Sequence, residues 1–268
     1  MRPKKTLGQH FLTSKAVVSS IIKAAQLSPS DTVLEVGPGK GVLTETLLEN
    51  AGKVIAVEKD DRLIAPLREK FANEIADGKL TLVHGDILDF SPESHKLRAG
   101  SYSVVANIPY YITGALLRHF LESNTPPERM VLLLQKEVAE RIVAKDGKES
   151  ILSMSVKVYG EPKYKKSVPA RCFSPKPKVD SAILSIENIS KHWQGQALPM
   201  LRIVKLGFSH KRKTLLNNLS VVSEKKAVED ALAHCGIPSG IRAEKLSVEN
   251  WMCLTRRLPL SPNSHLNT

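Results

Sequence analysis

Residues 33–41 read VLEVGPGKG, and they join two different patterns of apolar residues. The first four are mostly apolar and indicate a buried strand, whereas residues 42–48 read VLTETLL, with apolar residues at helical spacing. The glycines between them let the backbone approach a ligand and adopt positive φ without a Cβ penalty. A strand, a glycine-rich turn and a helix in this order are typical of an open α/β sheet with a ligand site at the carboxyl end of its first strand.

The turn suits a nucleoside better than a phosphate group. A P-loop has Ser or Thr after its Gly-Lys pair, but Lys40 is followed by Gly41. A dinucleotide turn places its third glycine three residues after the second, and here the interval is two. Pro38 also lacks the amide donor that a pyrophosphate would use. The favoured ligand is therefore a nucleoside without phosphates, of which S-adenosylmethionine is the common one; a turn that serves packing alone is the alternative.

Three further predicted strands also end at polar residues. The strands at 53–58, 80–87 and 102–106 lead to Glu58, Asp86 and Asn107, respectively. Because parallel strands bring their carboxyl ends to one edge of the sheet, we expect these side chains and Gly37 to line a single crevice. Glu58 follows Gly41 by 17 residues, near the spacing at which a carboxylate accepts both hydroxyls of a ribose. Asp86 is placed to accept a hydrogen bond from the adenine amino group.

The rest of the chain predicts one large α/β domain followed by a small helical one. Further strands are expected at residues 130–134, 156–159 and 182–186, which gives a mainly parallel, seven-stranded sheet of Rossmann-like type. Short helical segments follow at 200–209, 214–219, 224–235 and 248–257. We therefore predict an α/β domain over residues 1–188, which holds the ligand crevice, and a small all-α domain over residues 189–268.

Positive charge is concentrated in three segments of this chain, whose net charge is +12. Residues 1–30 hold five Lys or Arg and no acid, residues 157–180 hold seven against two acids, and residues 188–223 hold six against none. Such segregation favours a polyanionic partner whose binding weakens as salt rises, with Lys211, Arg212 and Lys213 as the densest patch. A basic protein without such a partner is the alternative.

The three cysteines, Cys172, Cys235 and Cys253, form no Cys-x-x-Cys pair. This pattern favours reduced cysteines in a cytoplasmic protein and argues against a zinc site, so we expect no metal. The basic amino terminus is not followed by the apolar run of a signal peptide, and no stretch approaches a membrane span. We expect a monomer that does not contact membranes.

Asn107-Ile108-Pro109-Tyr110 follows the fourth predicted strand and suits methylation of an exocyclic adenine amine. The lone pair of that nitrogen is delocalised into the ring, which makes it a poor nucleophile. The Asn107 side-chain carbonyl and the Ile108 main-chain carbonyl could accept both amino hydrogens and aim the lone pair at a methyl donor. Tyr110 offers a stacking face, worth about 1–3 kcal/mol, and Phe173 is a candidate for the other face. An ordinary turn with a packed tyrosine is the alternative.

The chain resembles a known family over nearly its whole length: the rRNA adenine N6,N6-dimethyltransferases of the small ribosomal subunit, of the bacterial kasugamycin-resistance (KsgA) type. The motifs that carry this resemblance are residues 7–12 (LGQHFL), 35–41 (EVGPGKG), Glu58, 85–86 (GD), 107–110 (NIPY), 135–139 (QKEVA), 173–181 (FSPKPKVDS) and 208–215 (FSHKRKTL). His10 stands where this family frequently has Asn, and Tyr111 where it has Asn or Gln.

The resemblance implies an S-adenosylmethionine-dependent methyltransferase fold and a set of site residues. It also implies that the domain over residues 1–188 is catalytic and that the helical domain over residues 189–268 binds RNA or the ribosome. The residues implied to bind the cofactor are His10, Leu12, Gly37, Gly39, Glu58, Asp86 and Asn107. Asn107, Pro109, Tyr110 and Phe173 are the implied catalytic residues, with the two aromatic rings on either face of the target base. The implied reaction dimethylates two adjacent adenosines in the 3′-terminal hairpin loop of small-subunit (16S) rRNA, within an assembling 30S subunit.

Three other functions would produce similar patterns. An antibiotic-resistance methyltransferase acting on large-subunit rRNA shares the catalytic half, although residues 208–219 favour the small-subunit enzyme. The Asn-x-Pro-Tyr motif also occurs in methyltransferases that act on DNA adenine or on a glutamine amide. Finally, an assembly factor without enzymatic activity could retain a cofactor pocket.

Overall fold

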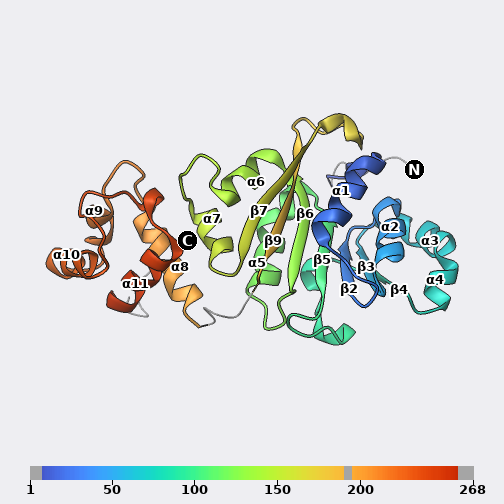
Figure 1. Cartoon of the computed structure of the whole chain (residues 1–268), viewed down its shortest axis with the longest axis horizontal. Helices are drawn as coiled ribbons and strands as arrows, with labels where there is room; N and C mark the ends of the chain where they lie inside the picture. The colour runs from blue at the N-terminus through green and yellow to red at the C-terminus, as the bar shows by residue number, and fades with distance from the viewer. Residues whose placement is uncertain (1–7, 190–194, 259–268) are drawn as a thin grey trace. The chain divides into compact units, whose positions relative to one another are not determined.

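The computed structural model describes residues 8–189 and 195–258 of the chain, and Figure 1 shows their secondary structure. The chain divides into two compact units. One consists of residues 1–139 and 160–190, and the other of residues 140–159 and 191–268. Within the described residues, no helix has the length and apolar composition needed to span a membrane.

A seven-stranded sheet forms the centre of the first unit, as the sequence predicts (Figure 1). Its strands are β2 (Thr32–Val36), β3 (Lys53–Glu58), β4 (Leu80–His84), β5 (Ser103–Asn107), β6 (Arg129–Gln135), β7 (Glu161–Val168) and β9 (Ser181–Glu187). They lie in the order β4-β3-β2-β5-β6-β9-β7. The pairs β6–β9 and β9–β7 are antiparallel, and the other four pairs are parallel. The strand order reverses between β2 and β5, which is where open α/β sheets form their ligand crevice.

Helices cover this sheet because each presents an apolar stripe to it. In α1 (Lys15–Ala25), the buried side chains Val17, Val18 and Ile21 recur at helical spacing, and the helix contacts β5, β6, β7 and β9. The unit also contains α2 (Val42–Asn50), α3 (Asp61–Lys70), α4 (Ala72–Ala76) and α5 (Thr113–Leu121) (Figure 1). One contiguous apolar core joins α1, α2 and α3 to the sheet.

A short two-stranded sheet joins distant parts of the chain in the same unit. In this sheet β1 (Phe11–Leu12) pairs antiparallel with β8 (Phe173–Ser174). The backbone N–H and the hydroxyl of Thr13 both donate to the carbonyl of Cys172 at 2.9 Å. The amino-terminal segment is thereby fixed to the segment that precedes β9.

The strand predicted at residues 156–159 is wrong. The helix α7 (Ile151–Lys157) occupies the first half of that range, and the edge strand of the sheet is β7, which begins at Glu161. Ser150 starts α7 with a capping box, in which its hydroxyl accepts from the Ser153 N–H and the Ser153 hydroxyl accepts from the Ser150 N–H. Apolar residues at alternate positions from 152 to 158 imitate a strand, whereas the cap that specifies a helix lies outside that pattern.

The second unit is helical and has its own core. It contains α7, α8 (Ala197–Gly207), α9 (Leu215–Leu219), α10 (Lys225–His234) and α11 (Val248–Arg257), while α6 (Lys136–Val143) runs into it from the first unit. Trp251 is fully buried in this core, and Met154 and Val158 belong to it as well. That packing explains why residues 140–159 group with the carboxyl-terminal helices, although the sequence pattern predicts that they belong to the domain over residues 1–188.

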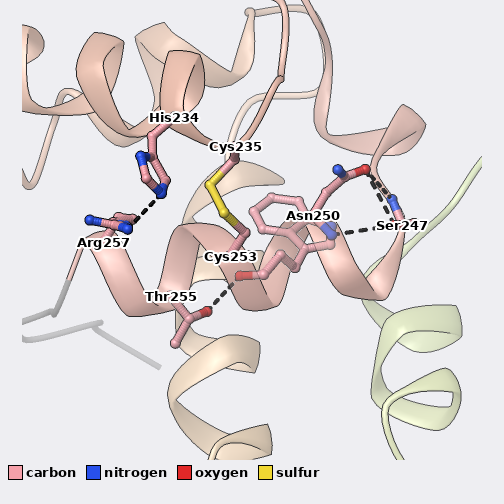
Figure 2. The surroundings of a disulfide bond; sticks show 8 residues. His234, Cys235, Ser247, Asn250, Cys253, Thr255 and Arg257 are labelled. Atoms are coloured by element: carbon pink, nitrogen blue, oxygen red, sulfur yellow. Dashed lines mark hydrogen bonds between the residues drawn. A yellow bond between two sulfur atoms is a disulfide. The ribbon is translucent and has the colours of Figure 1, made fainter.

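Figure 2 shows a disulfide bond between Cys235 and Cys253 in the helical unit. Cys235 follows the last residue of α10 and Cys253 lies in α11, and packing of these two helices places their Cα atoms 5.9 Å apart. The expectation that all cysteines are reduced is therefore wrong, and Cys172 alone is free. The bonded residues lie 18 positions apart, a spacing that carries no local signal, so cysteine usage no longer argues for a reducing compartment.

Candidate functional site

Four neighbouring parallel strands end at one open pocket in the first unit. Gly37 follows β2, Glu58 ends β3, Asp86 follows β4 and Asn107 ends β5, and all four line this pocket. The pocket spans about 810 Å³ of empty space, open solvent included. Of the remaining residues expected in the site, His10, Gly39, Pro109 and Tyr110 also line it.

Bare backbone forms part of the pocket wall. Gly37 has φ +68°, and a Cβ added there would meet no protein atom within 4 Å. The space beside it is therefore open to a ligand that approaches the main chain closely. Gly39, at φ +60°, has a different reason to be glycine, since a Cβ there would lie 3.0 Å from the Phe11 ring. Phe11 also lines the pocket, so the amino-terminal segment packs directly on the glycine-rich turn.

Glu58 is held rigidly by the backbone around it. Its carboxylate accepts hydrogen bonds from the N–H groups of Gly39 at 3.0 Å and Asp60 at 2.8 Å. Burial raises the pKa of Glu58, and these two hydrogen bonds oppose that rise in part. A carboxylate offers about four lone-pair sites, so two remain available for ribose hydroxyls.

Asp86 also lines the pocket, and it caps a short helical turn. Its carboxylate accepts from the Leu88 N–H at 3.1 Å and forms an ion pair with Lys59. Burial acts to raise the pKa of Asp86, but the hydrogen bonds from Lys59 and the Leu88 N–H, together with the charge of Lys59, outweigh it and hold the pKa below its usual range. Asp86 is thus an ionised acceptor, suited to the amino group of an adenine.

A hydrogen bond fixes the orientation of the Asn107 side-chain amide. Its Nδ2 donates to the main-chain carbonyl of His10 at 2.9 Å, an oxygen that can only accept. The amide nitrogen therefore faces His10 and the Oδ1 atom is left as an acceptor. In this way the amino-terminal segment sets the direction in which Asn107 can accept a hydrogen bond.

Tyr110 is likewise fixed beside Asn107. Its hydroxyl hydrogen-bonds to that of Ser181 at 2.8 Å, and Ser181 is completely buried. The ring stacks near His10, with the ring centroids 5.9 Å apart. Burial raises the pKa of Tyr110, so the ring stays a neutral phenol suited to stacking.

Two expected site residues do not line this pocket. Leu12 is buried in the apolar core and lines a smaller neighbouring cavity. Phe173, paired with Leu12 across the β1–β8 sheet, is only 5% exposed and packs in the same core. In this structure, Tyr110 is therefore not joined by Phe173 at the pocket.

Glu35 also belongs to the site, although the sequence pattern predicts no role for it. It is 1% exposed and lines the smaller cavity together with Gly37, Gly39 and Asn107. Neither carboxyl oxygen has a hydrogen-bond partner among the described residues. Burial raises its pKa to about 8; the nearby Thr44 hydroxyl lowers it in part, and the charge of Glu58 raises it further. The sequence does carry one sign that Glu35 is unusual, since it is an acid at the centre of an otherwise apolar strand.

Gln9 and Asp60 add a second fixed point for the amino-terminal segment. The Gln9 amide donates to the carboxylate of Asp60 at 2.8 Å. Asp60 is buried, accepts two hydrogen bonds from the Arg62 guanidinium, and through its own N–H holds Glu58. The segment that orients Asn107 is thus connected to the carboxylate expected to bind ribose.

This pocket lies where the strand order reverses. Its lining includes carboxylates at the place where a dinucleotide would put its phosphates, so it suits a nucleoside without phosphates better. Fold and site together place the chain in the class of Rossmann-like methyltransferases. The sequence model of one family, ribosomal RNA adenine dimethylase, matches residues 1–259. The chain belongs to the ribosomal RNA adenine dimethylase family.

Individual relatives agree with this assignment. A protein of Dehalococcoides mccartyi, named ribosomal RNA small subunit methyltransferase A, is 46% identical over 266 residues, which cover 95% of this chain and 88% of the relative. Among solved structures, the 23S rRNA methyltransferase ErmE is 30% identical with a TM-score of 0.76, covering 92% of this chain and 99% of ErmE. A dimethyladenosine transferase from Plasmodium falciparum is 28% identical with a TM-score of 0.78, and the match covers 91% and 96% of the two chains.

Proposed function

We propose that this protein transfers methyl groups from S-adenosylmethionine to the N6 amines of two adjacent adenosines in the 3′-terminal hairpin loop of small-subunit rRNA. The observation that carries the proposal is the fixed Asn107 amide, whose oxygen is left as an acceptor in the pocket that Tyr110 also lines. An exocyclic adenine amine needs such an acceptor next to a stacking surface.

The pocket residues fit the cofactor. When bound, S-adenosylmethionine supplies an electrophilic methyl group. Glu58 would hold its ribose, Asp86 would accept from its adenine amino group, and the bare backbone at Gly37 would admit it without a clash. His10, Gly39 and Asn107 complete the proposed binding set, and Leu12 supports it from the core.

Asn107 and its neighbours would act on the target amine. The Asn107 Oδ1 and the Ile108 carbonyl would accept the two amino hydrogens and draw the nitrogen toward tetrahedral geometry. Pro109 keeps this turn rigid, and Tyr110 would stack on the base. The amine becomes acidic as it is alkylated, so water can take its proton.

The similarity to relatives favours the small subunit as the source of the substrate. The Dehalococcoides relative named for the small subunit is 46% identical, whereas ErmE, named for 23S rRNA, is 30% identical. An assembling 30S subunit, a monomeric state and a cytoplasmic location are further parts of the proposal.

The helical unit would supply contacts to the RNA backbone. Lys211, Arg212 and Lys213 are exposed, and two of them line a groove with about 980 Å³ of empty space, open solvent included. Arg141 and Arg242 line the same groove, together with two acids, Glu244 and the Glu149 that is ion-paired with Lys157. Such a surface binds phosphates by charge and without reading sequence.

Changing Lys211, Arg212 and Lys213 together to alanine should weaken binding to the small subunit. If all three contact phosphates, the slope of log K against log salt should fall in magnitude by about 2–3, since each contact contributes about 0.7–0.9. Fluorescence anisotropy over a salt series would measure it. A variant with alanine at the exposed residues Lys53 and Lys79 is the control, and an unchanged slope for the triple variant would place the RNA contacts elsewhere.

Methyl transfer to hypomethylated small subunits tests the proposed function. We expect dimethyladenosine at two adjacent positions of the 3′-terminal hairpin, read by mass spectrometry. Large subunits, duplex DNA and release-factor protein are the alternative acceptors. Preferential labelling of any of these would reject the assignment.

A further inference from the structure

Residues 171–181 connect the candidate site to the surface of the first unit. Ser174 pairs with Phe11 in the small sheet, and Phe11 lines the pocket. The His10 Nδ1 atom donates to the carbonyl of Pro175 at 2.7 Å, because a carbonyl can only accept. This segment is therefore held against two residues of the pocket wall.

The far end of the segment is fixed to the pocket as well. Ser181 holds the Tyr110 hydroxyl, and the carboxylate of Asp180 accepts from the Ala170 N–H at 2.9 Å, which closes the segment into a loop. Pro177, near the middle of the loop, is buried. The loop thus has a defined position beside the ring on which the target base would stack.

This loop presents positive charge to solvent. Arg171, Lys176 and Lys178 are exposed, and in residues 8–189 and 195–258 none of their side chains makes an ion pair or a hydrogen bond. The one acid between residues 170 and 181 is Asp180, whose carboxylate accepts the Ala170 N–H. Lys176 and Lys178 flank Pro177, so their Cα atoms lie at most about 7 Å apart.

We propose that Arg171, Lys176 and Lys178 form a phosphate clamp, which binds the RNA backbone next to the adenosine that enters the pocket. This inference rests on the proposed function. A nucleotide whose base stacks on Tyr110 brings its flanking phosphates close to this loop, since His10 contacts both the ring and Pro175. Lysine binds phosphate as a point charge, and such contacts fix the position of the RNA without reading its sequence.

The clamp predicts a specific kinetic signature for a variant with both Lys176→Ala and Lys178→Ala. The Michaelis constant for hypomethylated small subunits should rise roughly tenfold, and the slope of log K against log salt should fall in magnitude by about 1.4, or 0.7 for each single-stranded contact. The kcat and the affinity for S-adenosylmethionine should stay within twofold, because the lysines position the backbone and do not touch the reacting atoms.

The matched control removes two exposed lysines from the opposite edge of the sheet. Lys53 begins β3 and Lys79 immediately precedes β4, so both lie at the amino ends of the strands, away from the pocket. The variant Lys53→Ala, Lys79→Ala changes net charge equally and should keep the wild-type Michaelis constant. If the Michaelis constant of the control variant rises as much as that of the clamp variant, the effect is one of net charge and the clamp is rejected.

A photo-crosslinking amino acid in place of Lys176 identifies the partner. We expect crosslinks to rRNA within a few nucleotides of the methylated adenosines. Crosslinks confined to a ribosomal protein, or to distant rRNA, would overturn the clamp. Wild-type protein that fails to methylate small subunits would reject the proposed function itself, whereas active wild type with an unaffected clamp variant rejects only this inference.

Discussion

Alanine at Asn107 should lower the rate of methyl transfer by at least about 10²–10³-fold, the cost of losing one preorganised polar group that acts on the reacting centre. The Oδ1 atom would be lost as acceptor for the target amine, and the nitrogen lone pair would stay delocalised into the ring. Binding of small subunits should survive, because the basic surfaces at residues 171–178 and 211–213 are untouched. Single-turnover kinetics with hypomethylated subunits, alongside a binding titration, would measure both quantities.

The control for this variant must separate the lost acceptor from a loosened amino-terminal segment, since Asn107 also donates to His10. Gln9→Ala removes the 2.8 Å hydrogen bond to Asp60 and loosens the same segment while leaving Asn107 in place. We expect Gln9→Ala to lose less than tenfold in rate. If both variants lose the same amount, or if Asn107→Ala keeps more than a tenth of the wild-type rate, Asn107 does not act on the amine.

The pocket was predictable because its residues occupy equivalent places in a repeating pattern. Gly37, Glu58, Asp86 and Asn107 each stand at the end of a predicted parallel strand, and the sheet brings such ends together whatever the details of packing. Nothing beyond strand assignment was needed for this grouping. The same regularity identified six of the seven strands, and the exception is β7.

Features that depend on tertiary packing were out of reach. The place of Phe173 follows from its pairing with Leu12, and the Cys235–Cys253 bond follows from the packing of α10 on α11. Each joins residues through contacts that no local spacing encodes. The helix α7 was missed for a different reason: alternating apolar residues outweighed the capping box at Ser150.

Glu35 should make this protein less stable as pH rises, whereas an ion-paired surface acid makes a protein less stable as pH falls. Its pKa is about 8 in the folded protein against an ordinary value of 4.5. Between these two values the folded state binds a proton that the unfolded state has released. The free energy of unfolding should therefore decrease as pH rises through this window, by up to about 1.4 kcal/mol per pH unit from this group.

Glu35→Gln should remove that dependence, because glutamine resembles the protonated acid in shape and carries no charge. At pH 5 the variant should match the wild type within about 1 kcal/mol, and by pH 8 it should be more stable by several kcal/mol, on the order of the slope integrated over the window. Urea denaturation at pH 5, 6, 7 and 8 would measure the difference. Glu45→Gln, at an exposed residue of α2 that is ion-paired with Lys70, is the matched control and should show no such divergence. Parallel stability curves for Glu35→Gln and wild type would mean that Glu35 is ionised in the folded protein, with a partner that satisfies its charge.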